Sequence, residues 1–597
     1  MGPALSTSGD DLTQPASTRT PSHRERTVLA ALHRANFVLL LCLWGLATLY
    51  LGGDLGKYLD DYSLCKRDPV TGNHECPVPY WRVVHAFYRP LHLTVVLNVQ
   101  TLLWEQGRLP HVLSALAHLL VVVLLWRLLS GIVRSPHVAW AAAVLFMVFP
   151  LHYEAIFWSA AIGGILGTAT FLALALLYMR LLDAERWWPG MILAALLAFT
   201  IPCWYEQAAT GILALPLLAM APLQGKAATL TRFRRSLLIV LACVAACALY
   251  IVLMLASMPP GSRGSSGSLV SASDVPQRLH TITASIGHAY SSVAGAILQG
   301  GCILAWQSLT PVRASVWACL IVACLLYWWP RWRAAAVPEN SLIQRSSIRH
   351  GLSILAGLAI FVLAWLPVGV VREHILEPRM YYYPTIGLII SLASMFDAVL
   401  MRWCQQGRRH RSTIALIGIV ASVAGLLGGL SLAGAQQMFQ ARSRLDDSEM
   451  VQLRELVPSP PPETYFVPLS VENRPARTGV AVFDSLAMGA LSTPWSAQAI
   501  VQATYHRGDV FTTCCNWWMP GPPIEQPDRS GFRYRIQDKR IAWPQSLPFV
   551  IDRHGRVHLV DRIRWGQAGD DGVELPHVRA ILQQRALPGR TFDFKPG

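Results

Sequence analysis

The chain has 597 residues, of which 53% are hydrophobic and only 14% charged, and its mean hydropathy is +0.38. Soluble proteins carry roughly 25% charged residues, so the composition excludes a large soluble enzyme and predicts a polytopic membrane protein. The formal net charge is +15, but the arginines cluster between apolar runs, which is the positive-inside pattern of membrane proteins. This distribution argues against nucleic acid as a partner.

Residues 1–28 are predicted to be a disordered cytoplasmic N-terminus, since the segment begins with a run rich in Ser, Thr, Pro and Gly. An apolar run follows and ends at about Leu51. A signal peptide is the alternative, but the apolar core is long and no Ala-x-Ala-type cleavage site follows it. We therefore expect an uncleaved first span in the inner (plasma) membrane.

The membrane domain is predicted over residues 29–433, with a first external loop at 52–110. Within this loop Leu91–Leu103 is apolar but short, which favours a helix lying along the interface. The stretch 281–306 is ambiguous, and the charge bias favours a place on the outer face. Apolar length predicts eleven spans. The first follows Arg34 and ends at about Leu51, and the others lie at about 111–129, 137–151, 158–181, 187–202, 206–222, 236–257, 314–330, 351–371, 380–401 and 412–433.

An odd number of spans places residues 434–597 on the extracytoplasmic side. This tail is rich in Pro, Trp and charge, with strand-like runs at Thr464–Leu469 and Pro548–Val560 and an amphipathic run at Pro494–Tyr505. The expected fold class is therefore an α-helical polytopic membrane protein with a small C-terminal α/β soluble domain.

The cysteines outside the apolar runs form two pairs of interest. Cys65 and Cys76 flank a polar stretch, and a disulfide between them is expected if that side is oxidising. The vicinal Cys514 and Cys515 are either redox-active or structural. No Cys-x-x-Cys or His-rich spacing occurs, which argues against a structural zinc site.

The first external loop concentrates the polar residues that chemistry could use. Asp60, Asp61 and Tyr62 come early in it, and His85, Tyr88, Arg89 and His92 follow. Charge near hydrocarbon is costly, so a paired acid at the mouth of a bundle favours a functional site. The alternatives are an acid cap on the following helix and, for Arg89, an arginine that snorkels to the headgroups.

Two further outward connections share this chemistry. The second contains His152 and Glu154, and the penultimate contains Arg379 followed by Tyr381–Tyr383. Glu154 could instead be a simple loop acid, and the tyrosines an aromatic belt at the interface. The histidines of the second span, His111 and His118, are expected to make interhelical hydrogen bonds. A further connection, Trp204-Tyr205-Glu206-Gln207, also lies outside.

Two reactions fit acids and bases on one face of a membrane bundle. In glycosyl transfer from a lipid-phosphate sugar, a carboxylate takes the acceptor proton and the transition state is oxocarbenium-like. Arginine pairs bidentately with the phosphate that leaves. Transport would instead place acids in the middle of spans, and the predicted spans two to eleven are nearly free of them.

The order of five motifs resembles that of GT-C glycosyltransferases, specifically the protein O-mannosyltransferase-like branch that uses polyprenyl-phosphate sugars. The resemblance covers about residues 30–435 and leaves the tail uncovered. The motifs are Tyr58-Leu59-Asp60-Asp61, Tyr88-Arg89-Pro90-Leu91, His111 to His118, Pro150-Leu151-His152-Tyr153-Glu154-Ala155-Ile156-Phe157-Trp158 and Glu377-Pro378-Arg379-Met380-Tyr381-Tyr382-Tyr383-Pro384.

The resemblance implies a role for each candidate residue. Asp60 or Asp61 is the catalytic base, while His152 and Glu154 have a polar role that positions a metal or the acceptor. Whether the site binds a divalent cation such as Mg or Mn remains open. The resemblance implies that Arg89 and Arg379 bind the donor phosphate, and we predict the same role for His85 and His92 of the first loop. The residues predicted to contact the acceptor or the sugar are Tyr62, Tyr88, Trp158 and Tyr382.

The chain departs from this family pattern at two places. Ser114 stands where relatives often carry Asn, and Ile162-Gly163-Gly164 stands after Trp158 where an Arg and an Asp are common. Because this Arg/Asp pair is absent, the predicted polar role of the second loop and the binding of a metal there are both in doubt. The alternatives are a different donor or a loss of activity.

The predicted function is inverting transfer of one sugar from a polyprenyl-phosphate donor to an extracytoplasmic glycan, lipid or protein. Two rival functions remain open. One is a glycan ligase or polymerase that uses lipid-diphosphate donors, and the other is a non-enzymatic lipid-glycan flippase or scaffold.

Overall fold

The computed structural model describes residues 89–100, 109–220, 229–257, 273–311, 314–315, 318–319, 322, 346–369, 378–405, 410–471, 491, 494–505, 507–512, 525–534, 539–552, 554–565 and 572–593. The predicted first span lies outside these residues. So do Asp60, Asp61, Tyr62, His85 and Tyr88, and the predicted cysteine pairs at 65/76 and 514/515.

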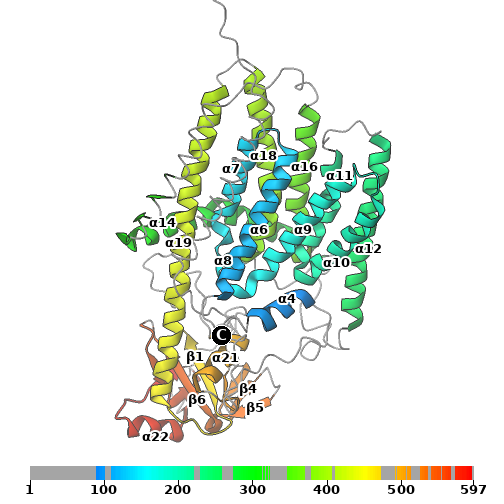
Figure 1. The fold of residues 1–597 in the computed structure, drawn as a ribbon. Helices are drawn as coiled ribbons and strands as arrows, with labels where there is room; N and C mark the ends of the chain where they lie inside the picture. The colour runs from blue at the N-terminus through cyan, green and yellow to red at the C-terminus, as the bar shows by residue number, and fades with distance from the viewer. Residues whose placement is uncertain are drawn as a thin grey trace, which may run out of the picture.

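A bundle of long apolar helices makes up the upper part of the molecule (Figure 1). Seven of the described helices are long and apolar enough to cross a membrane, and a bent pair raises the number to eight. The multi-pass helical prediction is therefore confirmed. Six of these seven are α6 (Leu109–Ile132), α9 (Ile162–Leu181), α12 (Thr229–Ser257), α16 (Ser346–Leu363), α18 (Tyr382–Gln405) and α19 (His410–Leu456). The shorter apolar helix α10 (Trp188–Trp204) also belongs to the bundle.

Two predicted spans are not single regular α-helices. The third is α7 (Pro136–Met147), followed after a 48° bend by η2 (Pro150–His152) and α8 (Tyr153–Phe157). Pro150 lacks an amide donor and cannot continue the helix. The sixth is a 3-10 helix, η4 (Glu206–Ala214), that continues as α11 (Leu215–Met220). A side chain at Gly211 would lie 2.9 Å from the Phe171 ring, so η4 packs directly against α9.

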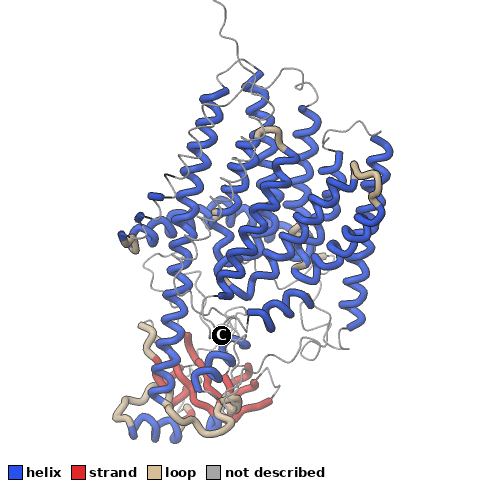
Figure 2. Tube along the Cα trace, viewed as in Figure 1, coloured by secondary structure: helices blue, strands red, loops and turns tan. Residues whose placement is uncertain are grey.

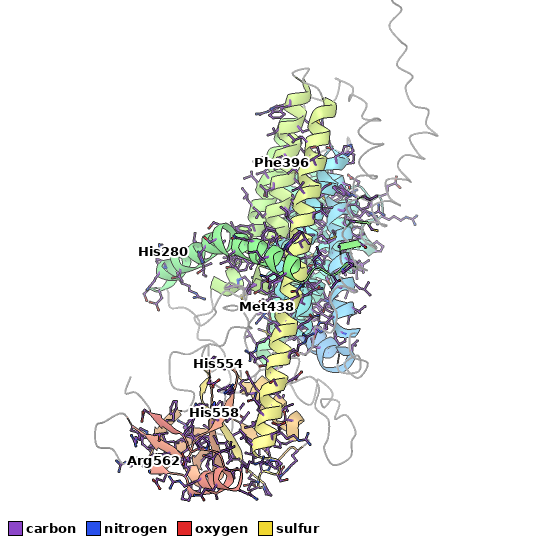
Figure 3. The ribbon with its side chains drawn as sticks, turned by 90° about the vertical axis from the view of Figure 1, so that its left-hand side faces the viewer. His280, Phe396, Met438, His554, His558 and Arg562 are labelled. Carbon is purple, nitrogen blue, oxygen red and sulfur yellow. The ribbon has the colours of Figure 1, made fainter. Side chains whose placement is uncertain are left out.

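The ambiguous stretch forms one bent helical segment, α13 (Val275–His288), η6 (Ala289–Val293) and α14 (Ala294–Gln307). Its length and hydropathy alone would allow it to cross a membrane. Figure 3 shows it lying across α19, with His280 far from the bundle. A side chain at Gly301 would come within 2.5 Å of the Ser431 Cα of α19. The predicted position of this stretch on the outer face of the membrane stays a prediction, since its helices also meet the length and hydropathy of a span.

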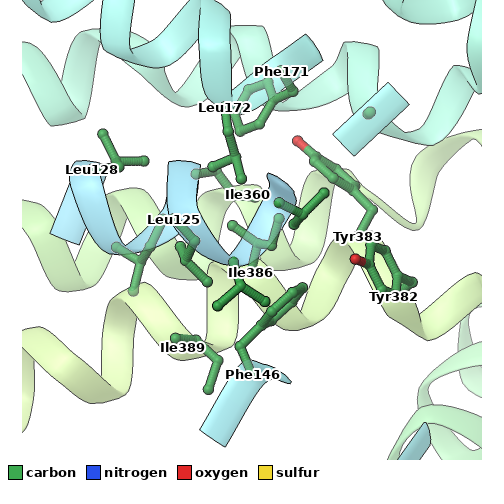
Figure 4. Packing of buried hydrophobic residues seen from close by; sticks show 14 of the residues in the cluster. Leu125, Leu128, Phe146, Phe171, Leu172, Ile360, Tyr382, Tyr383, Ile386 and Ile389 are labelled. Atoms are coloured by element: carbon green, nitrogen blue, oxygen red, sulfur yellow. The ribbon is translucent and has the colours of Figure 1, made fainter. Parts of the chain in front are cut away.

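The bundle core is made of aliphatic and aromatic side chains (Figure 4). Tyr381, Tyr382 and Tyr383 are only 3%, 1% and 2% exposed, so they do not form the alternative aromatic belt. The Tyr382 hydroxyl lies 2.6 Å from His118 Nδ1, and His118 Nε2 lies 3.0 Å from the Met147 carbonyl oxygen. A carbonyl only accepts, so Nε2 carries the proton and Nδ1 accepts from Tyr382. His118 therefore makes the interhelical hydrogen bonds that the sequence predicted for it.

A buried acid, Asp397, joins three elements at the end of the bundle remote from the C-terminal domain. Its side chain is 0% exposed. It accepts from the Arg134 and Ser135 amides at 2.9 and 3.0 Å, and lies 2.8 Å from His350 Nε2. The acid therefore caps the start of α7 and ties it to α16 and α18. The sequence reasoning gave this acid no role, although it lies within a predicted span.

Replacing Asp397 by Ala is expected to lower the free energy of unfolding by about 3 kcal/mol, because two buried amides and a buried imidazole lose their acceptor. Denaturant unfolding of the purified protein measures this. Asp183→Asn is the matched control, since Asp183 accepts from Arg232 at 3.2 Å on the exposed surface and exposed pairs contribute about 0–1 kcal/mol. Equal losses in the two variants would contradict the capping role.

The last bundle helix runs without a break into the C-terminal domain. Helix α19 has 47 residues, so the predicted domain boundary at 433/434 falls inside it. Beyond residue 434 it carries the buried Arg442–Asp446 ion pair. Its last turns hold the domain, since the Tyr505 hydroxyl donates to the Leu453 carbonyl at 3.1 Å and Gln452 accepts from the Val557 amide at 3.1 Å.

All described strands lie in this lower domain (Figure 2). The main sheet has the order β2-β1-β6-β7, with β1 parallel to both β2 and β6 and with β6 and β7 antiparallel. Helix α21 (Pro494–Tyr505) connects β1 to β2, as a parallel pair requires. The predicted α/β module is confirmed. The strands are β1 (Tyr465–Val471), β2 (Phe511–Thr512), β6 (Ser546–Ile551) and β7 (Val557–Leu559).

Two smaller three-stranded sheets and one helix complete the domain. The sheet β3-β4-β5 is antiparallel, and β8 pairs with β10 in parallel and with β9 in antiparallel fashion. The elements are β3 (Glu525–Asp528), β4 (Gly531–Tyr534), β5 (Lys539–Ala542), β8 (Arg562–Arg564), β9 (Val573–Glu574), α22 (Pro576–Gln584) and β10 (Thr591–Asp593).

Candidate active site

The first, second and penultimate connections meet at the end of the bundle that faces the C-terminal domain (Figure 1). The short helix α4 (Pro90–Thr94), which continues as η1 (Val95–Gln100), lies crosswise beneath the bundle (Figure 1). It packs against α9 and α10. A helix was predicted over Leu91–Leu103, and the structure has helical turns over Pro90–Gln100, which bring the end of the first loop under the bundle.

Arg89 begins this helix in a left-handed conformation, with φ 44° and ψ 54°. Its amide donates to the Tyr250 hydroxyl at 3.1 Å. Its Nε lies 2.9 Å from both carboxylate oxygens of Glu206, and its Nη2 lies 2.7 Å from Oε2. The guanidinium also stacks over the Tyr205 ring, 4.5 Å from its centroid. Arg89 is therefore held in place by α12 and by the connection between α10 and η4.

Arg379, in the 3-10 turn η8 (Pro378–Tyr381), forms a second arginine–glutamate pair. Its amide donates to Glu154 Oε2 at 2.9 Å, and its Nη1 lies 3.6 Å from Oε1. The guanidinium lies over the Trp158 ring at 4.2 Å. Glu154 is 3% exposed, so it is not the solvated loop acid of the alternative prediction. The second and penultimate connections are thus joined directly.

His92 lies close enough to Arg89 and Arg379 for their positive charges to affect its pKa. Burial, together with the positive charges of Arg89 and Arg379, lowers the pKa of His92 to about 3. The ring is therefore neutral at physiological pH. A contact between His92 and a phosphate would come from N–H donation and not from a positive charge. The ring also packs on Gly163 of α9, where a Cβ would lie 2.7 Å from the His92 Cγ.

His152 and Tyr382 lie deeper than the sequence predicted. Both are buried in the core, with ring centroids 4.7 Å apart, and Tyr382 bonds to His118. Tyr382 is thus a core residue and not the predicted sugar contact, because α18 turns its side chain into the bundle. Trp158, also predicted as a sugar contact, is 4% exposed and lies beneath Arg379.

No group of three or more His, Cys, Asp or Glu side chains able to hold a metal occurs among the residues that the structure describes. The two carboxylates of the site, Glu154 and Glu206, each face an arginine. Whether a divalent cation such as Mg or Mn binds stays open, as in the sequence analysis.

Four residues of this site were not predicted from the sequence. They are Tyr205, Glu206, Tyr250 and Gly163, on which the His92 ring packs. Glu206 had a detectable signal, because an acid beside aromatic residues at the outer end of a span is as costly as the predicted pair. Tyr250 had none, since it lies within an apolar helix. The site as a whole contains the guanidinium groups of Arg89 and Arg379 and the neutral imidazole of His92. Each guanidinium stacks on an aromatic ring and pairs with a carboxylate. Such a set of donors suits an anionic ligand.

Comparison with known proteins gives a limited result. No protein-family model and no curated protein matches the chain. Solved structures do match it. The Archaeoglobus fulgidus oligosaccharyltransferase in complex with Zn and sulfate has 12% identity and a TM-score of 0.39, with 78% of this chain and 61% of that chain covered.

Two more structures of archaeal oligosaccharyltransferases are similar at the same level. The Archaeoglobus fulgidus enzyme tethered to an acceptor peptide with the NVT sequon has 12% identity and a TM-score of 0.35, covering 80% of this chain and 68% of that chain. AglB from Archaeoglobus fulgidus, with an inhibitory peptide and a dolichol-phosphate, has 13% identity and a TM-score of 0.37, covering 81% and 64%. This chain spans less than two thirds of the length of the first and third of these proteins.

Proposed function

We propose that this protein is a membrane glycosyltransferase that moves one sugar from a polyprenyl-phosphate donor to an extracytoplasmic acceptor, with inversion. The observation that carries the proposal is the arrangement of two arginines from connections far apart in the sequence. Arg89 stacks on Tyr205 and Arg379 on Trp158, and each pairs with a glutamate at the same end of the bundle. Cations that converge at the end of an apolar bundle suit a phosphate whose lipid tail stays in the membrane.

In this proposal Asp60 or Asp61 takes the proton from the acceptor hydroxyl as its oxygen attacks the anomeric carbon. The bond from the anomeric carbon to the phosphate oxygen breaks, and the electron pair leaves with the lipid phosphate. Arg89 and Arg379 stabilise the negative charge on that leaving group. The Glu154 carboxylate contacts both the backbone amide and the guanidinium of Arg379, so the role of Glu154 is to position Arg379. The neutral His92 donates a hydrogen bond to the phosphate.

The membrane side and the role of the C-terminal domain belong to the same proposal. We place the site on the extracytoplasmic side and the N-terminus in the cytoplasm, as the arginine distribution predicts. The α19 extension packs against α8, where the Phe439 and Phe157 rings lie 6.2 Å apart. The domain thus stands beside the site, and we propose that it orients the acceptor.

The test is mass spectrometry of surface glycans, lipids and proteins from a strain that lacks the chain and from the complemented strain. The proposal predicts that one acceptor loses a single monosaccharide, and that purified protein releases polyprenyl phosphate from a single-sugar donor. Loss of a whole oligosaccharide, with turnover of lipid-diphosphate donors only, would establish a ligase or polymerase instead. Unchanged donors in the purified system would establish a flippase or scaffold.

A further inference from the structure

The guanidinium of Arg89 already holds an anion, the carboxylate of Glu206. The contact uses the edge formed by Nε and Nη2, with distances of 2.9 and 2.7 Å to the Glu206 oxygens. Arginine binds phosphate through the same pair of parallel N–H groups. The Glu206 carboxylate therefore occupies the place that two phosphate oxygens would take at this edge.

The position of Arg89 does not depend on Glu206 alone. Its amide bonds to the Tyr250 hydroxyl and its guanidinium rests on the Tyr205 ring. The left-handed φ of 44° is costly for a residue other than glycine, by about 1–2 kcal/mol, and it persists because these contacts hold it. Departure of the carboxylate would thus leave the guanidinium in place, ready for another anion.

The two arginine–glutamate pairs of the site differ in how easily the carboxylate can leave. Glu154 is 4% exposed and accepts the backbone amide of Arg379, so its departure would break a buried contact. Arg89 and Glu206 have side chains that are 24% and 27% exposed, so an incoming headgroup can reach the Glu206 carboxylate from solvent. An incoming phosphate can therefore compete with Glu206 but not readily with Glu154.

We propose that Glu206 is an exchangeable counter-ion of Arg89, which a lipid-linked phosphate displaces on binding and which returns when the lipid phosphate leaves. Glu206 is a positioning residue in this scheme, because it acts through Arg89. The inference rests on the proposed function and adds to it a site for the phosphate and a residue that competes for that site.

The experiment measures binding of a sugar-free polyprenyl phosphate to the full-length protein in lipid nanodiscs. Glu206→Gln removes the competing charge at nearly constant volume, so it is expected to bind the lipid about tenfold more tightly than wild type. Arg89→Gln is expected to bind at least tenfold more weakly. Asp183→Asn, which breaks the exposed pair with Arg232 at the other end of the bundle, is the matched control and should not differ from wild type. The corresponding polyprenyl alcohol should bind all four proteins alike.

Turnover gives a second readout that a structural defect would not imitate. In Glu206→Gln the KM for the donor is expected to fall, and kcat is expected to fall with it because the lipid phosphate leaves more slowly. Should this variant not fold, Glu206→Asp keeps the charge with a shorter reach and should bind the lipid phosphate at least as tightly as wild type.

Weaker or unchanged binding by Glu206→Gln, with Arg89→Gln still defective, would overturn the counter-ion role and leave the proposed function standing. Unchanged binding by Arg89→Gln would also overturn it, because the phosphate would then lie elsewhere. Failure of the proposed function is distinct, since it would appear as no turnover of any polyprenyl-phosphate sugar by the wild-type protein.

Discussion

Replacement of Asp60 and Asp61 by Asn together is expected to lower the rate of sugar transfer by about 10³-fold, since general base catalysis contributes roughly 10²–10⁴-fold. The amide cannot take the proton of the acceptor hydroxyl, and it cannot offset the positive charge that develops on the sugar ring. Donor binding should survive, because in the proposed scheme the phosphate is bound by arginines. The measurement is kcat and KM for the donor with the purified variant, beside its expression level and thermal midpoint.

The two single variants identify the base, because the one with the larger loss carries it. Asp54→Asn is the matched control, being an acid in the same loop and outside the proposed machinery, and it should keep wild-type activity. Retained transfer in the double variant, with normal expression, would remove these two residues from the mechanism.

The second large effect is expected at Gly163. A Cβ there would lie 2.7 Å from the Cγ of His92, whereas a Cβ at Gly164 meets nothing within 4 Å. Gly163→Ala must therefore push the His92 ring and α4 away from α9. A displacement of about 1 Å can cost about 10²-fold in rate, so we expect a loss of that order in kcat/KM for transfer.

Gly164→Ala provides the control within the same helical turn. It should keep activity and add about 1 kcal/mol of stability, since Ala suits a helix better than Gly. In addition, His92→Ala should restore the thermal midpoint of Gly163→Ala, because it removes the ring that clashes. Equal activities of the two glycine variants would show that the position of His92 against α9 does not matter for transfer.

The sequence was most informative where the signal is local. Apolar length predicted the multi-pass bundle, and periodicity predicted α21 at Pro494–Tyr505 with the same bounds that the structure has. It was less informative where packing decides the backbone. The break after α7 and the 3-10 helix η4 depend on Pro150 and on the close contact of Gly211 with Phe171, and apolar length registers neither of them.

For the site, the residue types and their common end of the bundle could be predicted, but not their partners. Arg89, Glu154 and Arg379 were named from the motifs and His92 from the polar first loop, and the structure gathers them at one end. Tyr382 and His152 were named on the same grounds but lie in the core, because helix direction near Pro150 and η8 turns them inward. A motif identifies which residue is present and does not determine which way its side chain points.

The sequence by itself determined that this chain crosses a membrane and that its charged motifs lie between the spans. The reason is that charge in hydrocarbon is costly, so residue type and the length of each apolar run are enough to predict both. Only the tertiary structure decided that Arg89 and Arg379 each pair with a glutamate and each stack on an aromatic ring. Pairing of that kind joins residues far apart in the chain, and its geometry depends on how helices pack and not on any local pattern.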